Sequence, residues 1–378
     1  MRHHYSILLV VISVVAGQVA AAADLQKVWE LDLRKLSNAR GVSHTRDLPV
    51  LALRFAPDGS RVAAIIDLYG PRDAQKSHLF VIDAHHPEAN PSVYEVSGKL
   101  NYDENGPGPD NFGWSPTGQI VYAGGAAISV GQGKGCELPW RSLFVTDNLA
   151  ITEDQVPVDW TALASHFTLF DRNCQPRGKW DVPERWIIVD TSPDLGLLSV
   201  SRLLGFPNKT EALVVDPLSR KVIRRWSGPE APGGQFADRG TAICRGSDVE
   251  AAERAPVICW EVDTGKKINE APAVNGGDPI ATALHASRII ASDYGRRKVP
   301  LSSDYVEILK RRVLWDFRTG KELASWRPRF QSWEFQLYLD PSKPLKRVSE
   351  PFRFAISPDG EYIAEGGSGE INLYKIEQ

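Results

Sequence analysis

The sequence has no strong excess of charge of either sign. Its 44 lysine and arginine residues nearly balance its 47 aspartate and glutamate residues, so the formal net charge is −3. Proteins that hold nucleic acid by general electrostatic attraction carry a clear excess of basic residues on the binding domain. We therefore expect no nucleic-acid partner.

Long apolar segments are also lacking, apart from one near the amino terminus. There, Arg2 precedes an apolar run over residues 7–17, and three alanines follow at 21–23. A charged start, a short apolar run and small residues are typical of a secretory signal peptide. The run is short for a membrane-spanning helix, which needs about 20 apolar residues. We predict a cleaved signal peptide over residues 1–23, with an uncleaved anchor as the alternative. The remaining chain, 24–378, is then a single exported domain, periplasmic or extracellular, with no stable membrane insertion.

Cysteine is scarce, and the four cysteines form no Cys-x-x-Cys pair. Zinc sites and thioredoxin-like redox motifs use that spacing, so neither is supported. In an oxidising compartment an even number of cysteines suggests disulfide bonds, and three pairings are possible. We favour Cys244–Cys259, because their flanking segments resemble neighbouring strands of one hairpin, which leaves Cys136–Cys174. Four buried free thiols are the alternative.

Catalytic and cofactor-binding motifs are missing as well. The chain contains neither His-Glu-x-x-His nor Gly-x-Ser-x-Gly, and no carboxylate pair that can be assigned as acid and base. The glycine-rich segment 131–135 does not fit a phosphate-binding loop, because Lys134 is followed by glycine rather than serine or threonine. We predict no cofactor and no metal site, and the missing motifs favour binding over catalysis.

What the sequence does contain is a repeat. Residues 352–377 read as three strands, with Ser357-Pro358-Asp359-Gly360 as the turn between the first two. Proline presets the backbone at the start of such a turn, and glycine accepts a positive φ. Similar units occur at residues 51–67, 112–125 and 187–202. This recurrence indicates a repeated β-structure.

A second signature marks the other half of the repeat. Trp260 and Trp315 are each followed by an acidic residue, two further residues and Thr-Gly-Lys. Each unit therefore has four strands, two joined by each type of turn, which is the sheet of one β-propeller blade. Trp29, Trp260, Trp315 and Trp326 recur at strand positions and are expected to pack between blades.

These two turn signatures resemble those of the Trp-Asp repeat superfamily of β-propellers, and the Ser-Pro-Asp-Gly units also resemble Tol-type periplasmic propellers. The Gly-His pair that usually precedes the first strand of a Trp-Asp repeat is missing, which departs from the family's pattern and its hydrogen-bond network. The resemblance implies an all-β fold, a β-propeller in one domain, and a role in binding other molecules.

Counting first turns gives about six four-stranded blades, with seven as the alternative. The turns are taken at the following positions, the last two in degenerate form: Pro57, Pro116, Pro193, Pro358, Gly246 and Ser287. The last unit has only three strands after Phe352. Its fourth strand is expected from residues 27–33, which would close the ring and remove an open sheet edge.

The lengths of the connections separate the two faces of such a ring. The first and third turns of each blade lie on one face and are short here. The second turns and the connections between blades lie on the other face and are long, and long insertions on one face of a repeat protein commonly mark its binding side. The candidate binding residues come from these connections: His44, Arg72, Asp103, Asp110, Trp140, Arg296 and Arg297.

Some of these residues suggest a specific chemistry. Asp103 and Asp110 stand in a glycine-rich segment with oxygen ligands of the kind calcium prefers, although the spacing fits no standard calcium loop and a solvated connection is the alternative. Arg296 and Arg297 belong to a basic cluster that suits an anionic ligand or an acidic partner, with a solvated rim as the alternative. His285 is expected within a strand.

Two functions remain open at this point. In the first, the chain is an exported scaffold that binds a protein partner or a small ligand through the face with the long connections. In the second, which the resemblance implies, it is a propeller enzyme of the lactonase, phosphatase or quinone-dependent dehydrogenase type with a central site. The sequence shows no catalytic residues for the second, so it favours the first.

Overall fold

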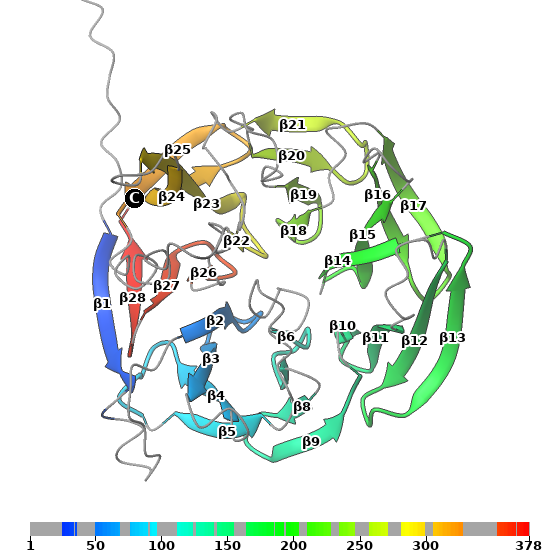
Figure 1. The fold of residues 1–378 in the computed structure, drawn as a ribbon, viewed down its shortest axis with the longest axis horizontal. Coiled ribbons are helices and arrows are strands. Elements are labelled where there is room, and N and C mark those ends of the chain that lie inside the picture. Colours follow the sequence, from blue (N-terminus) through cyan, green and yellow to red (C-terminus); the bar gives the residue numbers. More distant parts are fainter. Residues whose placement is uncertain are drawn as a thin grey trace, which may run out of the picture.

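The chain forms a ring of β-sheets in the computed structural model (Figure 1). The structure describes residues 25–33, 35, 50–68, 76–89, 91–96, 112–123, 126–139, 142–154, 164–184, 186–192, 194–203, 210–227, 234–245, 257–270, 281–298, 305–327, 354–367 and 369–377. These residues form 28 strands in seven four-stranded antiparallel sheets. No helix within these ranges is long and apolar enough to cross a membrane.

Each sheet is one blade, and the blades are numbered in chain order. Blade 1 consists of β2 (Val50–Phe55), β3 (Arg61–Leu68), β4 (Lys76–Asp83) and β5 (Ser92–Val96); blade 2 of β6 (Phe112–Trp114), β7 (Ile120–Ala123), β8 (Ala126–Ser129) and β9 (Gly133–Glu137); blade 3 of β10 (Ser142–Thr146), β11 (Leu149–Asp154), β12 (Ser165–Asp171) and β13 (Pro176–Val182). Blade 4 consists of β14 (Trp186–Ser192), β15 (Leu197–Leu203), β16 (Thr210–Asp216) and β17 (Lys221–Ser227); blade 5 of β18 (Gln235–Ala237), β19 (Ala242–Arg245), β20 (Ile258–Glu261) and β21 (Lys267–Glu270); blade 6 of β22 (Ala281–Thr282), β23 (Arg288–Lys298), β24 (Tyr305–Asp316) and β25 (Lys321–Trp326); and blade 7 of β26 (Phe354–Ile356), β27 (Tyr362–Gly366), β28 (Glu370–Ile376) and β1 (Leu25–Asp32).

The ring has seven blades, so the preferred count of six is wrong and the alternative is confirmed. The missed unit is blade 3, which lies between the turns at Pro116 and Pro193. Its β10 and β11 are joined through Asp147 and Asn148, without the proline and glycine that mark the first turns of blades 1, 2, 4 and 7. In blade 5 the first turn lies at 238–241 rather than near Gly246, which is outside the described residues.

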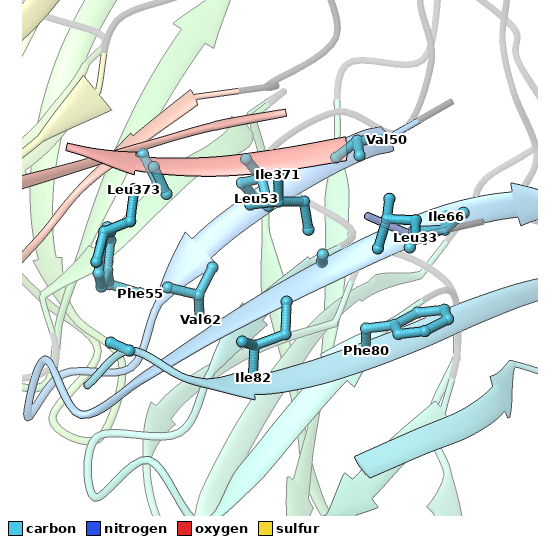
Figure 2. Close-up of a cluster of buried hydrophobic side chains, with 14 residues drawn as sticks. Leu33, Val50, Leu53, Phe55, Val62, Ile66, Phe80, Ile82, Ile371 and Leu373 are labelled. Carbon is cyan, nitrogen blue, oxygen red and sulfur yellow. The ribbon is translucent and has the colours of Figure 1, made fainter. Parts of the chain in front are cut away.

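The first strand of the chain completes the last blade, as predicted. β1 pairs antiparallel with β28, from Leu25 opposite Ile376 to Asp32 opposite Glu370. Directly after β1, the fully buried Leu33 joins an apolar cluster between blades 7 and 1, shown in Figure 2. The chain's two ends are thereby joined in one sheet, and blade 7 gains the fourth strand that it otherwise lacks.

The core is divided among the junctions of the ring. Within the described residues, buried apolar side chains form seven clusters, one between each pair of neighbouring blades. Each blade is covered on both faces, so an inner strand can carry an unbroken apolar run, and every residue from Val62 to Ile66 of β3 is fully buried. The strand tryptophans follow this pattern: Trp315 belongs to the cluster of blades 5 and 6, and Trp29 packs against that of blades 7 and 1.

The two kinds of short turn form for the physical reasons that the sequence indicates. In first turns, Gly59 and Gly360 adopt φ values of +75° and +76°, which side chains with a Cβ rarely tolerate. In third turns, an aspartate at the end of the third strand accepts hydrogen bonds from N–H groups of the turn. Asp216 accepts from Leu218 N at 2.9 Å, and hydrogen bonds from Ser219 and Leu218 lower its pKa although burial acts in the opposite direction. Asp316, the acidic residue after Trp315, accepts from Arg318 N and Thr319 N in the same way, which explains its place in the repeat.

Both favoured disulfides are present. Cys244–Cys259 joins β19 to β20, whose residues stand directly opposite each other in the antiparallel register. Cys136–Cys174 joins β9 of blade 2 to the turn after β12 of blade 3. One bond therefore cross-links strands inside a blade, and the other ties two neighbouring blades. Two disulfides in one chain indicate an oxidising environment.

Candidate functional site

The ring has two faces with different kinds of connection. In each antiparallel blade, the turn from the first to the second strand and the turn from the third to the fourth leave from one end. We call this end the short-turn face. The second turns and the connections between blades leave from the opposite end, which we call the long-loop face. Among them are the long segments 69–75, 97–111, 271–280 and 328–353, which lie outside the described residues.

The predicted binding residues belong to the long-loop face, but the structure describes few of them. His44, Arg72, Asp103, Asp110 and Trp140 lie outside the described residues, so their roles stay predictions. The backbones of Arg296 and Arg297 lie in β23, opposite Glu307 and Val306 of β24. β23 and β24 are the longest strands described, and Arg296 and Arg297 stand near the end of this pair at the long-loop face.

The short-turn face is held together by contacts between turns of different blades. His285, predicted within a strand, lies instead in the turn between β22 and β23, because β22 ends at Thr282. Its backbone N–H donates to Pro358 O in blade 7 at 2.7 Å, and its Nε2 lies 3.6 Å from Asp194 Oδ2 of blade 4. Likewise, Arg318 of blade 6 forms an ion pair with Asp238 of blade 5 at 2.6 Å. These contacts fix the turns against one another.

The described part of the ring encloses a central cavity of about 110 Å³ that sequence reasoning did not identify. It is partly open and lined by the first strand of every blade, with the following residues in contact: Leu53, Arg54, Phe55, Pro57, Phe112, Gly113, Trp114, Tyr122, Ser142, Leu143, Phe144, Asp190, Thr191, Gln235, Ala281, Thr282, Leu284, Phe354, Ala355, Ile356 and Pro358. Most of this lining is apolar or aromatic. A few polar groups in such surroundings are typical of ligand sites in proteins.

Six lining residues share one position in the repeat, which we call the inner ring position. Each pairs with the residue nine places later on the second strand of its blade: Arg54, Gly113, Asp190, Gln235, Ala281 and Ala355. Successive side chains of a strand point to opposite sides. Residues at the same position of each blade therefore point the same way, toward the axis of the ring. In blade 3 a register shift between Phe144 and Thr146 interrupts the pattern.

The inner ring position carries two charges of opposite sign, on Arg54 and Asp190. Asp190 Oδ2 accepts a hydrogen bond from Phe236 N at 2.8 Å, and the N–H of Thr191 also donates to this carboxyl. Burial raises the pKa of Asp190 to about 6, although the charge of Arg54 and the two N–H donors act in the opposite direction. The residue keeps some exposure because it faces the cavity, whereas the carboxyl group is largely surrounded by protein atoms.

Two further polar side chains, those of Thr282 and Gln235, line the same cavity. Thr282 Oγ1 donates to Phe236 O at 2.7 Å and lies 3.5 Å from Gln235 Oε1. Thr282 is thus tied to β18, the strand whose Phe236 N–H donates to Asp190. The only other titratable group in this lining is Tyr122, and its hydroxyl donates to Pro139 O at 3.1 Å.

Another arginine and carboxylate, Arg312 and Glu365, lie behind the residues that line the central cavity. Arg312 of β24 and Glu365 of β27 join blades 6 and 7, with Nη1 and Oε1 2.9 Å apart, and each side chain is only 3% exposed. The guanidinium of Arg312 also lies 4.0 Å from the ring centre of Phe354, whose side chain lines the cavity. This pair faces no open space of its own, so its role is to join the blades.

Metal binding has little support in the part of the chain that the structure describes. No group of three or more histidine, cysteine, aspartate or glutamate residues there could hold a metal ion. The segment with Asp103 and Asp110 lies outside that part. The absence of a metal site therefore stays a prediction for the whole chain.

Comparisons with known proteins match the fold over nearly the whole chain. A chain from the crystal structure of the mitotic checkpoint complex matches over 100% of both chains, with 11% sequence identity and a TM-score of 0.52. An oligogalacturonate lyase in complex with manganese matches over 88% of this chain and 90% of the lyase, with 12% identity and a TM-score of 0.54. Together with the seven four-stranded blades, these likenesses confirm the predicted β-propeller fold.

These likenesses establish the fold and no activity, because one fold supports many unrelated functions. No protein-family model and no curated protein matches the sequence. The function has to be argued from the residues of this propeller itself.

Proposed function

We propose that this chain is an exported binding protein that docks a protein partner on its long-loop face. The observation that carries the proposal is the segregation of the connections. The turns of the short-turn face are brief and held by contacts between blades, such as His285 with Pro358 and Asp194. Most connections of the opposite face are longer and varied in sequence, as in segments 97–111 and 328–353. A rigid ring that presents long connections on one side is suited to recognising a partner.

Export is supported by two independent features. The disulfides Cys136–Cys174 and Cys244–Cys259 suit an oxidising compartment, and residues 1–23 have the pattern of a signal peptide. Alkylation of free thiols in intact cells, before lysis and reduction, tests this. We expect all four cysteines to be protected until a reductant is added. Labelling of the four cysteines without reduction would contradict export.

Site-specific crosslinking tests the docking face. A photo-crosslinking amino acid is placed at positions 44, 72, 103, 140 and 296, one at a time, on the long-loop face. Matched positions 58, 86 and 219 lie in turns of the short-turn face and are exposed or partly exposed. After irradiation in the native cells and purification under denaturing conditions, we expect one discrete protein attached at several long-loop positions and at none of the controls.

The result has clear alternatives. Crosslinks to one protein only from positions 58, 86 and 219 would show that the faces are assigned the wrong way round. Absence of any crosslinked protein at all eight positions, with normal expression of each variant, would contradict docking of a partner on this face.

A further inference from the structure

We propose that the central cavity binds a small molecule with a carboxylate and a short apolar body, and that this ligand binds together with one proton. Its carboxylate contacts Arg54 and accepts a hydrogen bond from the protonated side chain of Asp190. The proposal concerns the axis of the ring and does not depend on a protein partner at the long-loop face.

Space for the ligand lies beside Arg54. At the inner ring position, Arg54 of blade 1 stands between Gly113 of blade 2 and Ala355 of blade 7, which have no side chain or a single methyl group. A Cβ placed on Gly113 would meet no atom within 4 Å. An arginine has five N–H donors, so it can bind a carboxylate while it keeps another partner. The small neighbours therefore leave the guanidinium accessible from the cavity.

The lining of the cavity favours an apolar body of limited size. Aromatic rings from three blades, those of Phe112, Phe144 and Phe354, border the same space. A dry cavity of about 150 Å³ holds a benzene molecule. A cavity of about 110 Å³ therefore accommodates about five non-hydrogen atoms, the size of propionate.

The charged groups of the cavity lining favour a ligand of negative charge. Arg54 and Asp190 are its only charged groups among the described residues. β10 presents Ser142, Leu143 and Phe144 toward this space, and β18 presents Gln235, so neither strand beside Asp190 adds a titratable group. An added cation would leave a net positive charge in poorly solvated surroundings, which is unfavourable. An added anion restores neutrality if Asp190 takes up a proton.

Asp190 is suited to take up that proton. Burial already raises its pKa to about 6, so near neutral pH protonation requires little free energy. A bound carboxylate disfavours the ionised form further, because a like charge nearby raises the pKa of a carboxyl. The affinity for the ligand is then expected to fall as the pH rises above about 6, by nearly tenfold per pH unit.

The test is isothermal titration calorimetry with sodium propionate, with propylamine and propanol as probes of matched size. We expect propionate to bind with a dissociation constant on the order of 1 mM at pH 6, and the other two probes not to bind. Titrations at pH 7.5 in two buffers with different ionisation enthalpies should show uptake of nearly one proton per propionate.

Three variants and one control separate the parts of the proposal. Arg54→Gln should abolish binding. Asp190→Asn should keep binding but lose both the proton uptake and the dependence on pH, because the asparagine amide donates in place of the protonated carboxyl. Gly113→Leu should abolish binding by filling the space, whereas Gly178→Leu, at another glycine with open space around it, should have no effect.

The proposal is overturned by any of several results. These are no propionate binding between pH 5 and 8, binding to the native protein without proton uptake, unchanged binding in the Gly113→Leu variant, or preferential binding of propylamine. Since proton uptake is measured on the native protein, the proposal stays testable if a variant fails to fold.

Discussion

Two arginines inside the ring interact with a carboxylate, Arg312 with Glu365 through an ion pair and Arg54 with Asp190 through the attraction of their charges, and the surroundings of the two differ. Arg312 and Glu365 are sealed between blades 6 and 7, each with a side chain only 3% exposed. Arg54 and Asp190 belong to blades 1 and 4 and border a cavity that their small neighbours leave open. The same two chemical groups thus occur once with protein on every side and once beside empty space.

The difference shows when buried charges can have a function beyond folding. A molecule from outside cannot reach a sealed pair, so the charges of that pair act on the packing of the two blades. A pair beside a cavity can exchange a partner or a proton with a molecule that enters. Burial of a charged group alone therefore does not identify a ligand-binding site. The open space beside the charged group distinguishes such a site from a structural ion pair.

The largest effect is expected from breaking the sealed pair. Arg312→Met removes the cation that pairs with the buried carboxylate of Glu365, and removing one partner of a buried pair typically lowers the free energy of unfolding by about 3–5 kcal/mol. Urea denaturation measures it. The matched control is Arg311→Met, because Arg311 is 41% exposed and its pairs with Asp293 and Glu322 are expected to contribute less than about 1 kcal/mol. Equal losses in both variants would show that the Arg312–Glu365 pair is not sealed.

Replacing both partners of the sealed pair sharpens the comparison. In Arg312→Met with Glu365→Leu no buried charge remains unpaired, so most of the stability lost in the single variant should return. A double-mutant cycle from urea denaturation measures the coupling between the two residues, which we expect to exceed about 2 kcal/mol. Additive losses would mean that each residue stabilises the junction through its own separate contacts.

Asp190, which faces Arg54 at the central cavity, is expected to affect stability through its titration with pH rather than through packing. The pKa of Asp190 is about 6 in the folded protein, above its ordinary value of 3.8. Between these values the folded protein keeps a proton that the unfolded chain has released, so this group makes the stability fall as the pH rises from about 4 to about 6. Relative to Asp190→Asn, the native protein should lose at most about 3 kcal/mol between pH 4 and pH 7. A difference that stays constant over this range would contradict the raised pKa.

The smallest effect concerns Arg54 as a neighbour of Asp190. The charge of Arg54 lowers the pKa of the Asp190 carboxyl against the effect of burial. Arg54→Gln should therefore move the titration of Asp190 upward by about one pH unit. Carboxyl chemical shifts followed by nuclear magnetic resonance measure this midpoint directly. A lower titration midpoint of Asp190 in the variant would mean that the Arg54 and Asp190 side chains do not attract each other across the central cavity.

Much of the fold could be predicted from the sequence because the turns carry local signals. Proline and glycine in the first turns, and Thr-Gly-Lys in the third, indicate where the strands of a blade begin and end. Blade 3 was missed because Asp147 and Asn148 form its first turn without either residue. The favoured pairing of Cys244 with Cys259 is confirmed because both lie on neighbouring strands of one hairpin, where local spacing is informative.

The channel pair was not predicted, because Arg54 and Asp190 lie far apart in the sequence and meet only when the ring closes. A signal was nevertheless present. When the repeats are aligned at their first turns, Arg54, Asp190 and Gln235 occupy one position, which holds glycine or alanine in blades 2, 6 and 7. A charged residue at a repeat position that holds the smallest residues in other blades is a pattern that could be read without a structure. The residues predicted from loop length, such as His44 and Asp103, stay predictions.

The pairing of β1 with β28 also has a consequence for how the protein is made. β1 precedes the other strands in the sequence, but its partner β28 begins only at Glu370, so blade 7 stays incomplete until the residues of β28 have left the ribosome. Bringing together segments this distant in the sequence is slow compared with forming a local hairpin. A chain that stops before residue 370 keeps an unpaired sheet edge, which invites aggregation and proteolysis. A truncated copy is therefore expected to be cleaved by proteases faster than a copy whose blade 7 is complete.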